Sequence, residues 1–317
     1  MEFDLIARIR GRAATRDDVV LGIGDDAALL RVPAGMQLAV AMDTLNAGVH
    51  FPEDTMPADV GWKALAVNLS DLAAMGAQPA WCTLSLSLPG ADDAWLDAFL
   101  DGFLGLAARH GVALVGGDTT RGPLSVCVAV HGFAGPGRAL RRDGAKAGDD
   151  VWVTGTLGDA AAALWLSRRG GGTTPALRRR LDRPEPRVSA GRALVPLAHA
   201  CIDVSDGLLA DLGHVCSASG VGARIDVDAL PASDALLALE VDVGLRRRWQ
   251  ATGGDDYELC FTAPPRARDA IAAALADAGV AATRIGGIVA GEGVLAVDGN
   301  GDAWQPASPG YRHFEVE

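Results

Sequence analysis

The sequence predicts a mixed α/β (α+β) protein of two domains. Three observations lead to this prediction. The chain has 317 residues, of which 49% are hydrophobic, so it can bury a core in each of two domains of ordinary size. Short apolar runs alternate with amphipathic helical patterns, and a stretch rich in glycine and basic residues divides the chain. We expect domains at residues 1–137 and 148–317, joined by a connection at 138–147.

In the first half, four apolar runs end in glycine or aspartate, which is typical of strands. These runs are VVLGIGDD, QLAVAMDT, VALVGGDTT and SVCVAVHGFAG. Two helices are predicted, over residues 62–76 and after Asp92, because apolar residues recur there at three- and four-residue spacing. The stretch 135–150 has no sustained apolar periodicity, so we expect it to connect the domains.

The second half repeats the alternation of strands and helices. Strands are expected at VWVTG, CIDVS, ARIDVD, YELCFTAP, TRIGGIV and GVLAVDG, and helices over 160–166, 189–200, 208–218, 245–249 and 267–278. The polar segment 168–187 contains three glycines and three prolines. We expect this segment to be a mobile surface loop.

Charge and cysteine usage exclude several classes of protein. The net charge is −12, with 28 basic against 40 acidic residues, and this sign repels nucleic acid and anionic membrane surfaces. The five cysteines are widely spaced without a CxxC pair, so neither a zinc site nor a disulfide framework is expected. The N-terminus lacks the apolar stretch of a signal peptide, and no run is long enough to span a bilayer. We therefore expect a cytoplasmic protein without nucleic-acid or membrane partners.

Aspartates gather in six short segments, each at the end of a strand or on the polar face of a helix. Magnesium prefers oxygen ligands, and at phosphate sites it is usually held by one or two carboxylates with waters and phosphate oxygens. The alternative is that each aspartate is a turn or cap residue. One of Asp203 and Asp206 could be the N-cap of the helix that follows Gly207. The residues concerned are Asp25, Asp26, Asp43, Asp71, Asp118, Asp203, Asp206, Asp255 and Asp256.

Glycine pairs flank several of these aspartates, and they allow the backbone to turn tightly and bring N–H groups close to phosphate oxygens. The known nucleotide motifs are absent from the sequence: there is no GxxxxGK[ST] loop, no protein-kinase signature and no complete dinucleotide fingerprint. If the protein binds ATP, it therefore does so with a fold that lacks these motifs.

The ordered motifs GIGDDAAL, DTLNAGVHF, KALAVNLSDLAAMGAQP, VGGDTTRGPL, IDVSDGL, GGDDYELCF and GYRHF resemble the thiamine-monophosphate kinase family. That family belongs to a superfamily with aminoimidazole ribonucleotide synthetase, selenophosphate synthetase and a hydrogenase maturation protein, and the resemblance extends from Phe3 to Phe314. It implies an aminoimidazole ribonucleotide synthetase-like fold, with N-terminal sheets paired across a homodimer and a C-terminal α/β domain. It also implies that ATP, several Mg²⁺ ions and thiamine monophosphate meet in a cleft between the domains, and that thiamine diphosphate is formed.

The same resemblance implies site residues, position by position. The implied metal ligands are Asp26, Asp43, Asp71, Asp118, Asp203 and Asp206; the nucleotide contacts are Gly117, Asp118, Arg142 and Ser205; the substrate contacts are His50, Asp255 and Tyr311. The chain departs from the family pattern in two places. Ala41 and Met42 stand where hydroxyl residues are usual, and Asp255 stands where glutamate is common.

The expected reaction is direct, in-line phosphoryl transfer. A phosphate monoester is already largely ionised at pH 7, so no strong general base is required. Metal ions and positive side chains would offset the repulsion between the phosphates, with Arg142 as the best candidate clamp and Arg138, Arg141 or Lys146 as substitutes. The non-functional alternatives are that the basic linker is solvent-exposed and that His50 is a packed core residue. Trp304 and Tyr311 would then pack within the C-terminal tail and would not stack on the substrate.

Three other functions stay open from the residues. A multi-metal acidic site could hydrolyse phosphate esters, and phosphate release without ATP would indicate this function. A regulatory module would bind ATP without turnover. Another ATP-using member of the same superfamily is the nearest enzymatic alternative.

Overall fold

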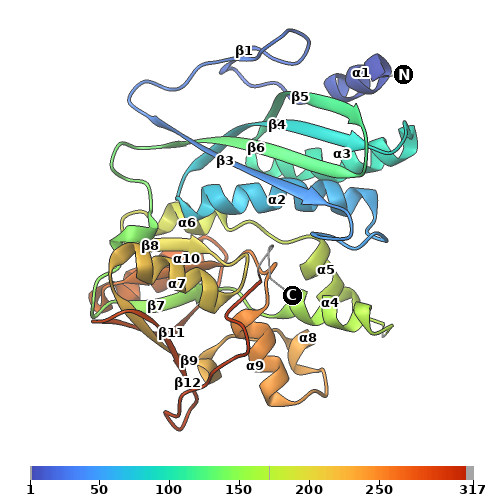
Figure 1. The fold of residues 1–317 in the computed structure, drawn as a ribbon. Coiled ribbons are helices and arrows are strands. Elements are labelled where there is room, and N and C mark those ends of the chain that lie inside the picture. The colour runs from blue at the N-terminus through green and yellow to red at the C-terminus, as the bar shows by residue number, and fades with distance from the viewer. Residues whose placement is uncertain (1, 171, 312–317) are drawn as a thin grey trace. The chain divides into compact units, whose positions relative to one another are not determined.

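The computed structural model describes residues 2–170 and 172–311, and its mixture of helices and sheets confirms the predicted class (Figure 1). The chain forms two compact units. The first unit comprises the chain up to Leu72 together with Ala77–Gly137, and the second comprises Ala73–Gly76 and the chain from Arg138 onward. Residues 312–314 of the GYRHF motif lie outside the described residues.

The first unit contains a four-stranded sheet in the order β3-β6-β4-β5. Its strands are β3 (Gln37–Asn46), β6 (Ser125–Ala134), β4 (Gln78–Leu88) and β5 (Ala113–Arg121), and only β4 and β5 run parallel. The predicted strands at QLAVAMDT, VALVGGDTT and SVCVAVHGFAG are thus confirmed, whereas β4 was not predicted. Helices α2 (Pro57–Ala74) and α3 (Asp93–His110) lie along one face of this sheet (Figure 1).

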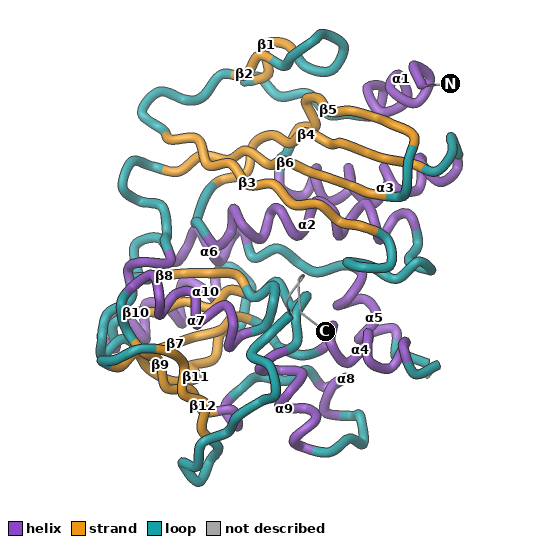
Figure 2. The backbone as a smooth tube through the Cα atoms, viewed as in Figure 1, coloured by secondary structure: helices purple, strands orange, loops and turns teal. Residues whose placement is uncertain are grey.

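The opposite face carries the hairpin of β1 (Val19–Leu21) and β2 (Leu29–Leu30), as Figure 2 shows. Val19, Ala28 and Leu30 pack there against a small cluster that includes Trp81 and Phe133. Asp18 anchors the start of the hairpin, because its Oδ1 accepts a hydrogen bond from Trp81 Nε1 at 2.9 Å.

Helix α1 (Glu2–Arg12) was not predicted, because charged residues dominate its sequence. Leu5 and Ile9, four residues apart, are buried. Its arginines pair with α3: Arg8 contacts Asp97 at 2.7 Å, and Arg12 contacts Asp101 at 2.5 Å. Each surface ion pair of this kind adds little stability. The buried Leu5 and Ile9 and the paired arginines therefore hold α1 in place together.

The second unit contains a six-stranded sheet in the order β12-β9-β11-β7-β10-β8. The strands are β12 (Gly293–Val297), β9 (Gly222–Asp226), β11 (Ala282–Val289), β7 (Asp150–Thr154), β10 (Leu259–Ala263) and β8 (Ala200–Asp203). Only β12 and β9 run parallel, and the other neighbouring strands run antiparallel, as is typical of the α+β class. All six strands were predicted from their apolar runs.

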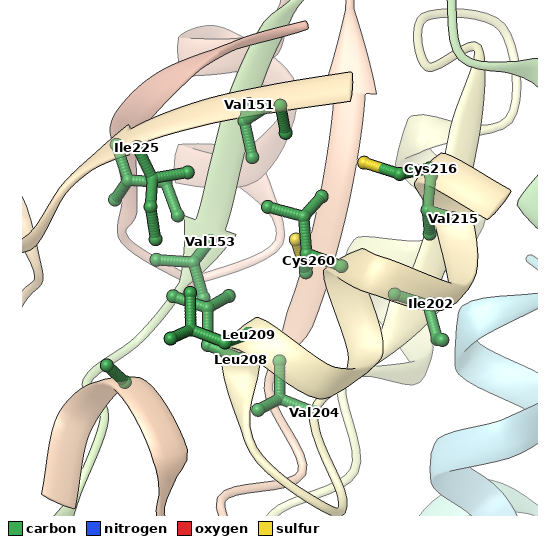
Figure 3. Close-up of a cluster of buried hydrophobic side chains, with 14 of the residues drawn as sticks. Val151, Val153, Ile202, Val204, Leu208, Leu209, Val215, Cys216, Ile225 and Cys260 are labelled. Atoms are coloured by element: carbon green, nitrogen blue, oxygen red, sulfur yellow. The ribbon is translucent and has the colours of Figure 1, made fainter. Parts of the chain in front are cut away.

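Helix α7 (Leu208–Ser219) buries its apolar face on this sheet. Figure 3 shows Leu208, Leu209 and Cys216 of α7 in one cluster with Val153 and Cys260 of the strands. Because side chains alternate along a strand, Trp152 lies on the other face, where it stacks on Phe261 and lines a pocket with residues of α10 (Arg268–Asp277).

The remaining helices of the second unit are α4 (Asp159–Arg168), α5 (Pro175–Asp182), α6 (Val188–Leu194), α8 (Asp234–Leu237) and α9 (Val243–Thr252), with short 3-10 turns at Arg142–Gly144, Val227–Ala229 and Pro265–Ala267. The prediction of a loop over 168–187 is wrong, because α5 lies within it. Thr174 caps α5 by accepting a hydrogen bond from Leu177 N, Pro175 occupies its first turn, and Leu177 and Leu181 are buried.

The basic connection at residues 138–147 is hydrogen-bonded to the second unit. Arg141 O accepts a hydrogen bond from Cys201 N at 3.0 Å, and Arg142 O accepts one from Ser219 Oγ at 2.9 Å. The arginine side chains themselves are exposed. No helix among the described residues is both long enough and apolar enough to cross a membrane.

Candidate functional site

Two of the predicted metal ligands in the first unit lie at opposite edges of its sheet. Asp43 is on β3 and Asp118 is on β5, with β6 and β4 between them. Three strand spacings separate the two edges by roughly 14 Å. Within one copy of this sheet, the two carboxylates therefore do not ligate the same ion.

Asn68, a residue that the sequence analysis missed, links the strand of Asp43 to α2, the helix that carries Asp71. Asn68 lies on α2, and its Oδ1 accepts a hydrogen bond from Asp43 N at 2.9 Å while its Nδ2 donates to Ala64 O at 2.9 Å. The side chain is fully buried. Asp71 follows three residues later on the same helix, so it lies on a neighbouring face. Asn68 thus fixes the backbone of one candidate ligand beside the helix that carries another.

Asp26 lies in the exposed turn between β1 and β2, where its N–H donates to Asp25 Oδ1 at 2.9 Å. Gly24 in the same turn has φ 123°, and a Cβ there would lie 2.5 Å from Nη1 of Arg10. The turn therefore needs glycine for its backbone conformation, whereas the Arg10 side chain could move aside for a Cβ.

Gly117 also requires glycine, because the backbone of β4 lies too close for any side chain. Its φ is 149°, and a Cβ would lie 1.8 Å from Leu84 O. The next residue, Asp118, accepts a hydrogen bond from Thr119 N at 2.9 Å and is exposed. Gly117 thus serves strand packing, and the carboxylate of Asp118 stays at the surface.

His50 lies in a turn that the side chain of Lys63 on α2 supports. Its Nδ1 accepts a hydrogen bond from Asn46 N at 3.0 Å, and its carbonyl accepts one from the buried Lys63 Nζ at 3.0 Å. An Nδ1 that accepts places the proton of the neutral imidazole on Nε2. In this tautomer, His50 presents a donor from Nε2.

The departures at Ala41 and Met42 fall on different faces of β3. Side chains alternate along the strand, so Ala41 shares the face of Asp43 whereas Met42 lies on the opposite, exposed face. Of these two residues, only Ala41 lies on the same face of the strand as Asp43.

In the second unit, Asp203 ends β8 and is buried, and Ser205 and Asp206 follow in the loop before α7. The N-cap position of α7 is Gly207, and no side chain caps it from that position. Neither Asp203 nor Asp206 is therefore the N-cap residue. Burial raises the pKa of Asp211, in the first turn of α7, to about 7, and the neighbouring charges of Asp203 and Asp206 add to this shift.

The GGDDYEL segment packs directly against this loop. Asp255 N donates to Ser205 O at 2.9 Å, and Tyr257 N donates to Val204 O at 2.8 Å. Asp255 and Tyr257 both have positive φ, 69° and 50°, which is uncommon for residues other than glycine. The Tyr257 hydroxyl donates to Asp255 Oδ1 at 3.2 Å. The structure thus brings Ser205 and Asp255 together and holds Asp255 in a strained backbone conformation.

Tyr311 joins the same loop through its backbone, because its N–H donates to Asp206 O at 2.9 Å. Its side chain is half exposed. Trp304 instead packs against the core of the second unit, which confirms the packing alternative for that residue. Arg142 lies on the 3-10 turn of the connection, with an exposed side chain.

A buried ionic network behind the GGDDYEL segment was also missed from the sequence. Both carboxylate oxygens of Asp256 accept from Gly158 N at 3.0 Å, and burial raises the pKa of Asp256 well above 3.8 against the opposing charge of Arg180. Glu258 is fully buried and binds Arg180, Arg187 and Thr154. These contacts join α5 and the start of α6 to the loop that carries Asp255 and leads into β10.

The carboxylates present suit magnesium held jointly with a substrate. Across residues 2–170 and 172–311, no three or more His, Cys, Asp or Glu side chains gather closely enough to hold a metal on their own. Magnesium at phosphate sites usually takes only one or two carboxylates, and waters and phosphate oxygens complete its shell. The aspartates above supply hard oxygen donors of this kind.

Comparison with known proteins places these elements in a family. Residues 24–134 match the AIR synthase related protein N-terminal domain, and residues 146–298 match the corresponding C-terminal domain. Thiamine-monophosphate kinase of Salmonella typhimurium is 53% identical over 291 residues, covering 90% of this chain and 89% of that protein. The crystal structure of thiamine-monophosphate kinase from Stenotrophomonas maltophilia superposes with a TM-score of 0.89 at 55% identity, covering 96% and 98% of the two chains. AaThiL complexed with AMPPCP and TMP gives a TM-score of 0.78 at 32% identity, covering 98% and 96%.

Proposed function

The chain belongs to the thiamine-monophosphate kinase family, with both AIR synthase related domains, and we propose that it converts thiamine monophosphate to thiamine diphosphate by direct, in-line, magnesium-assisted transfer from ATP. The ATP-dependent phosphorylation of thiamine monophosphate follows from this membership. The observation that carries it is identity of 53% over nine-tenths of the chain. The related AaThiL structure contains an ATP analogue together with TMP, which supports the same pair of substrates.

The proposed metal ligands are the six aspartates at 26, 43, 71, 118, 203 and 206. Bound Mg²⁺ would neutralise phosphate charge and orient the transferred group. Carboxylates in both units are hard oxygen donors, which supports this assignment. We further propose that Gly117, Asp118, Arg142 and Ser205 contact the nucleotide, and that His50, Asp255 and Tyr311 contact the thiamine phosphate.

The acceptor phosphate of thiamine monophosphate is its own nucleophile. Its second pKa is about 6, so its oxygen is largely ionised at pH 7 and needs no strong base. The hydrogen bond from Asn46 N to His50 Nδ1 supports a donor role for this histidine and not a role in removing a proton. Positioning and charge neutralisation then supply most of the rate enhancement.

We propose a homodimer that forms through the outer face of the N-terminal sheet. Leu38, Val40 and Met42 alternate along β3 on that face, and the side chains of Val40 and Met42 are 59% and 65% exposed. Exposed apolar patches of this kind mark interaction sites in soluble proteins. We also propose a cytoplasmic location, because all five cysteines are free thiols.

Incubation with ATP, Mg²⁺ and thiamine monophosphate tests the function directly. We expect thiamine diphosphate and ADP in equal amounts, and little product from unphosphorylated thiamine, because thiamine lacks the charge that the site recognises. Equal rates with thiamine and its monophosphate would refute the assignment. Phosphate release without ATP would indicate a phosphatase instead.

The metal ligands are tested by Asp71→Asn and Asp118→Asn, with Asp17→Asn as a control of the same charge change at an exposed position. We expect both ligand variants to fold, to lose most activity and to lose the rise in Tm that magnesium with ATP gives the wild type. The control keeps both. Retention of the wild-type shift and near-normal turnover in the ligand variants would make these aspartates turn residues.

A further inference from the structure

The loop before α7 contains three successive N–H groups that converge on one atom. Ser205 N, Asp206 N and Gly207 N donate to Oδ2 of Asp211 at 3.0, 3.1 and 3.1 Å. Asp211 is buried, and it reaches back from the first turn of the helix that the loop precedes. Convergent N–H groups at the start of a helix are the arrangement with which proteins bind phosphate and other anions. Here a carboxylate of the chain itself occupies that position.

The backbone carbonyls of the loop are also used inside the protein. Ser205 O accepts from Asp255 N, and Asp206 O accepts from Tyr311 N, both at 2.9 Å. With both N–H groups and both carbonyls of Ser205 and Asp206 bonded, the loop offers a ligand its side chains. These side chains are a hydroxyl and a carboxylate, which suit a cation and not a bare anion.

The packing around the loop leaves its backbone little freedom. Gly207 has φ 127°, and a Cβ there would lie 2.8 Å from the carbonyl of Thr252. A Cβ on Gly254 would lie 2.6 Å from Ser205 O, and one on Gly310 would lie 2.7 Å from Asp206 O. Thr252, Gly254 and Gly310 therefore pack closely against the loop, and Asp211 accepts hydrogen bonds from its N–H groups.

We propose that Asp211 is a positioning residue for the magnesium site of Asp203 and Asp206. It occupies the anion position of the loop, so that no phosphate binds the loop N–H groups directly, and it orients Asp206 toward a cation. This inference rests on the proposed function, which supplies the cation and its phosphates. The residues that support metal ligands from behind typically change metal affinity or activity by about 10- to 100-fold when they are replaced.

Two substitutions separate the charge of Asp211 from its geometry. Asp211→Asn keeps one oxygen that can accept N–H groups but removes the charge, whereas Asp211→Ala removes the acceptor altogether. Asp242→Asn is the matched control. Asp242 also accepts two N–H groups at the start of a helix, from Gly244 at 2.8 Å and Leu245 at 3.2 Å, but it is exposed and caps α9.

The experiment measures the Tm of the full-length protein in three titrations: Mg²⁺ at a fixed concentration of a non-hydrolysable ATP analogue, the analogue alone, and inorganic phosphate alone. We expect Asp211→Asn to require about tenfold more Mg²⁺ for half of the wild-type shift. We expect inorganic phosphate to stabilise Asp211→Ala more than the wild type, because the emptied N–H groups become an anion site. In steady-state assays, we expect the kcat of Asp211→Asn to fall while its KM for thiamine monophosphate changes by less than about twofold. The Asp242→Asn control follows the wild type throughout.

Wild-type magnesium dependence in a folded Asp211→Asn protein overturns the inference, as does a wild-type protein that shows no magnesium-dependent shift. If Asp211→Ala does not fold, Asp211→Asn still decides the question. The two proposals fail separately. A protein that shows the expected shifts but does not phosphorylate thiamine monophosphate refutes the function alone, and an active enzyme whose Asp211→Asn variant behaves like the wild type refutes the role of Asp211 alone.

Discussion

Replacement of Glu258 by glutamine removes the central charge of the buried network behind the GGDDYEL segment. Glu258 is fully buried, and its carboxylate accepts hydrogen bonds from three side chains. Arg187 contacts it through Nη2 at 2.5 Å and Nε at 2.6 Å, Arg180 Nη2 contacts it at 2.9 Å, and Thr154 Oγ1 donates to it at 2.7 Å. Glutamine fits the same space, so the change tests the charge and not the volume.

The expected cost follows from Arg187, which loses its carboxylate partner, and from Arg180, which keeps Asp159 at 3.5 Å. Breaking one member of a buried ion pair typically costs 3–5 kcal/mol, because the remaining charge stays desolvated. The side chains of Arg180 and Arg187 are 21% and 16% exposed, so water relieves part of this cost. We therefore expect a loss of about 3 kcal/mol. For a unit of this size, that corresponds to a fall in Tm of about 6–12 °C.

Calorimetry of the wild type and Glu258→Gln at pH 7 measures this loss, with Asp143→Asn as the control. Asp143 pairs with Arg141 at 2.5 Å, but this pair lies at the surface, so the same change should lower the Tm little. A Glu258→Gln protein within about 1 °C of the wild type would refute the reasoning. It would mean that the network contributes no net stability.

Two further predictions follow from the first unit. We expect Gly117→Ala to lower the Tm by several degrees and to abolish turnover, because the new Cβ would meet Leu84 O at 1.8 Å; Gly105→Ala, in open space on α3, is the control for calorimetry and the kinase assay. The hydrogen bond from Arg16, reinforced by Trp81 and opposed by burial, lowers the pKa of Asp18 below 3.8. Its stabilising contribution is therefore present above pH 3.8 and is lost as the pH falls through the lower folded-state pKa. Asp18→Asn should cost about 1 kcal/mol at pH 7, and this cost should shrink as the pH falls below 3.8, as followed by tryptophan fluorescence during urea unfolding. A cost that stays constant as the pH falls would contradict the charged hydrogen bond.

Elements with a strong apolar signal were predicted from the sequence, and the misses have physical causes. Helix α2 is buried over most of its length, and strands β3 and β6 are long apolar runs, so their patterns are clear. Strand β4 alternates Leu84, Leu86 and Leu88 with polar residues, and a search for continuous apolar runs overlooks that pattern. Helix α5 was hidden by its arginines, whose charges are paired within the fold.

The candidate site shows the same division. Motifs identify the aspartates, but the residues that hold them depend on contacts between distant parts of the chain. Asn68 lies 25 residues from Asp43, and Glu258 lies 78 residues from Arg180, so no local pattern marks either pair. Asp211 was accessible in principle, because an acidic residue in the first turn of a helix is a recognised N-terminal signal.

The hydrogen bond between Asn68 and Asp43 N also limits uncontrolled strand pairing along the edge of this sheet. Strand β3 is ten residues long, lies at the edge of its sheet and exposes valine and methionine, features that favour uncontrolled pairing with strands of other chains. Asn68 occupies one of the outward N–H groups near the middle of this edge. A foreign strand therefore cannot form an unbroken ladder along β3, and a buried asparagine that fixes a candidate ligand also protects the edge against aggregation.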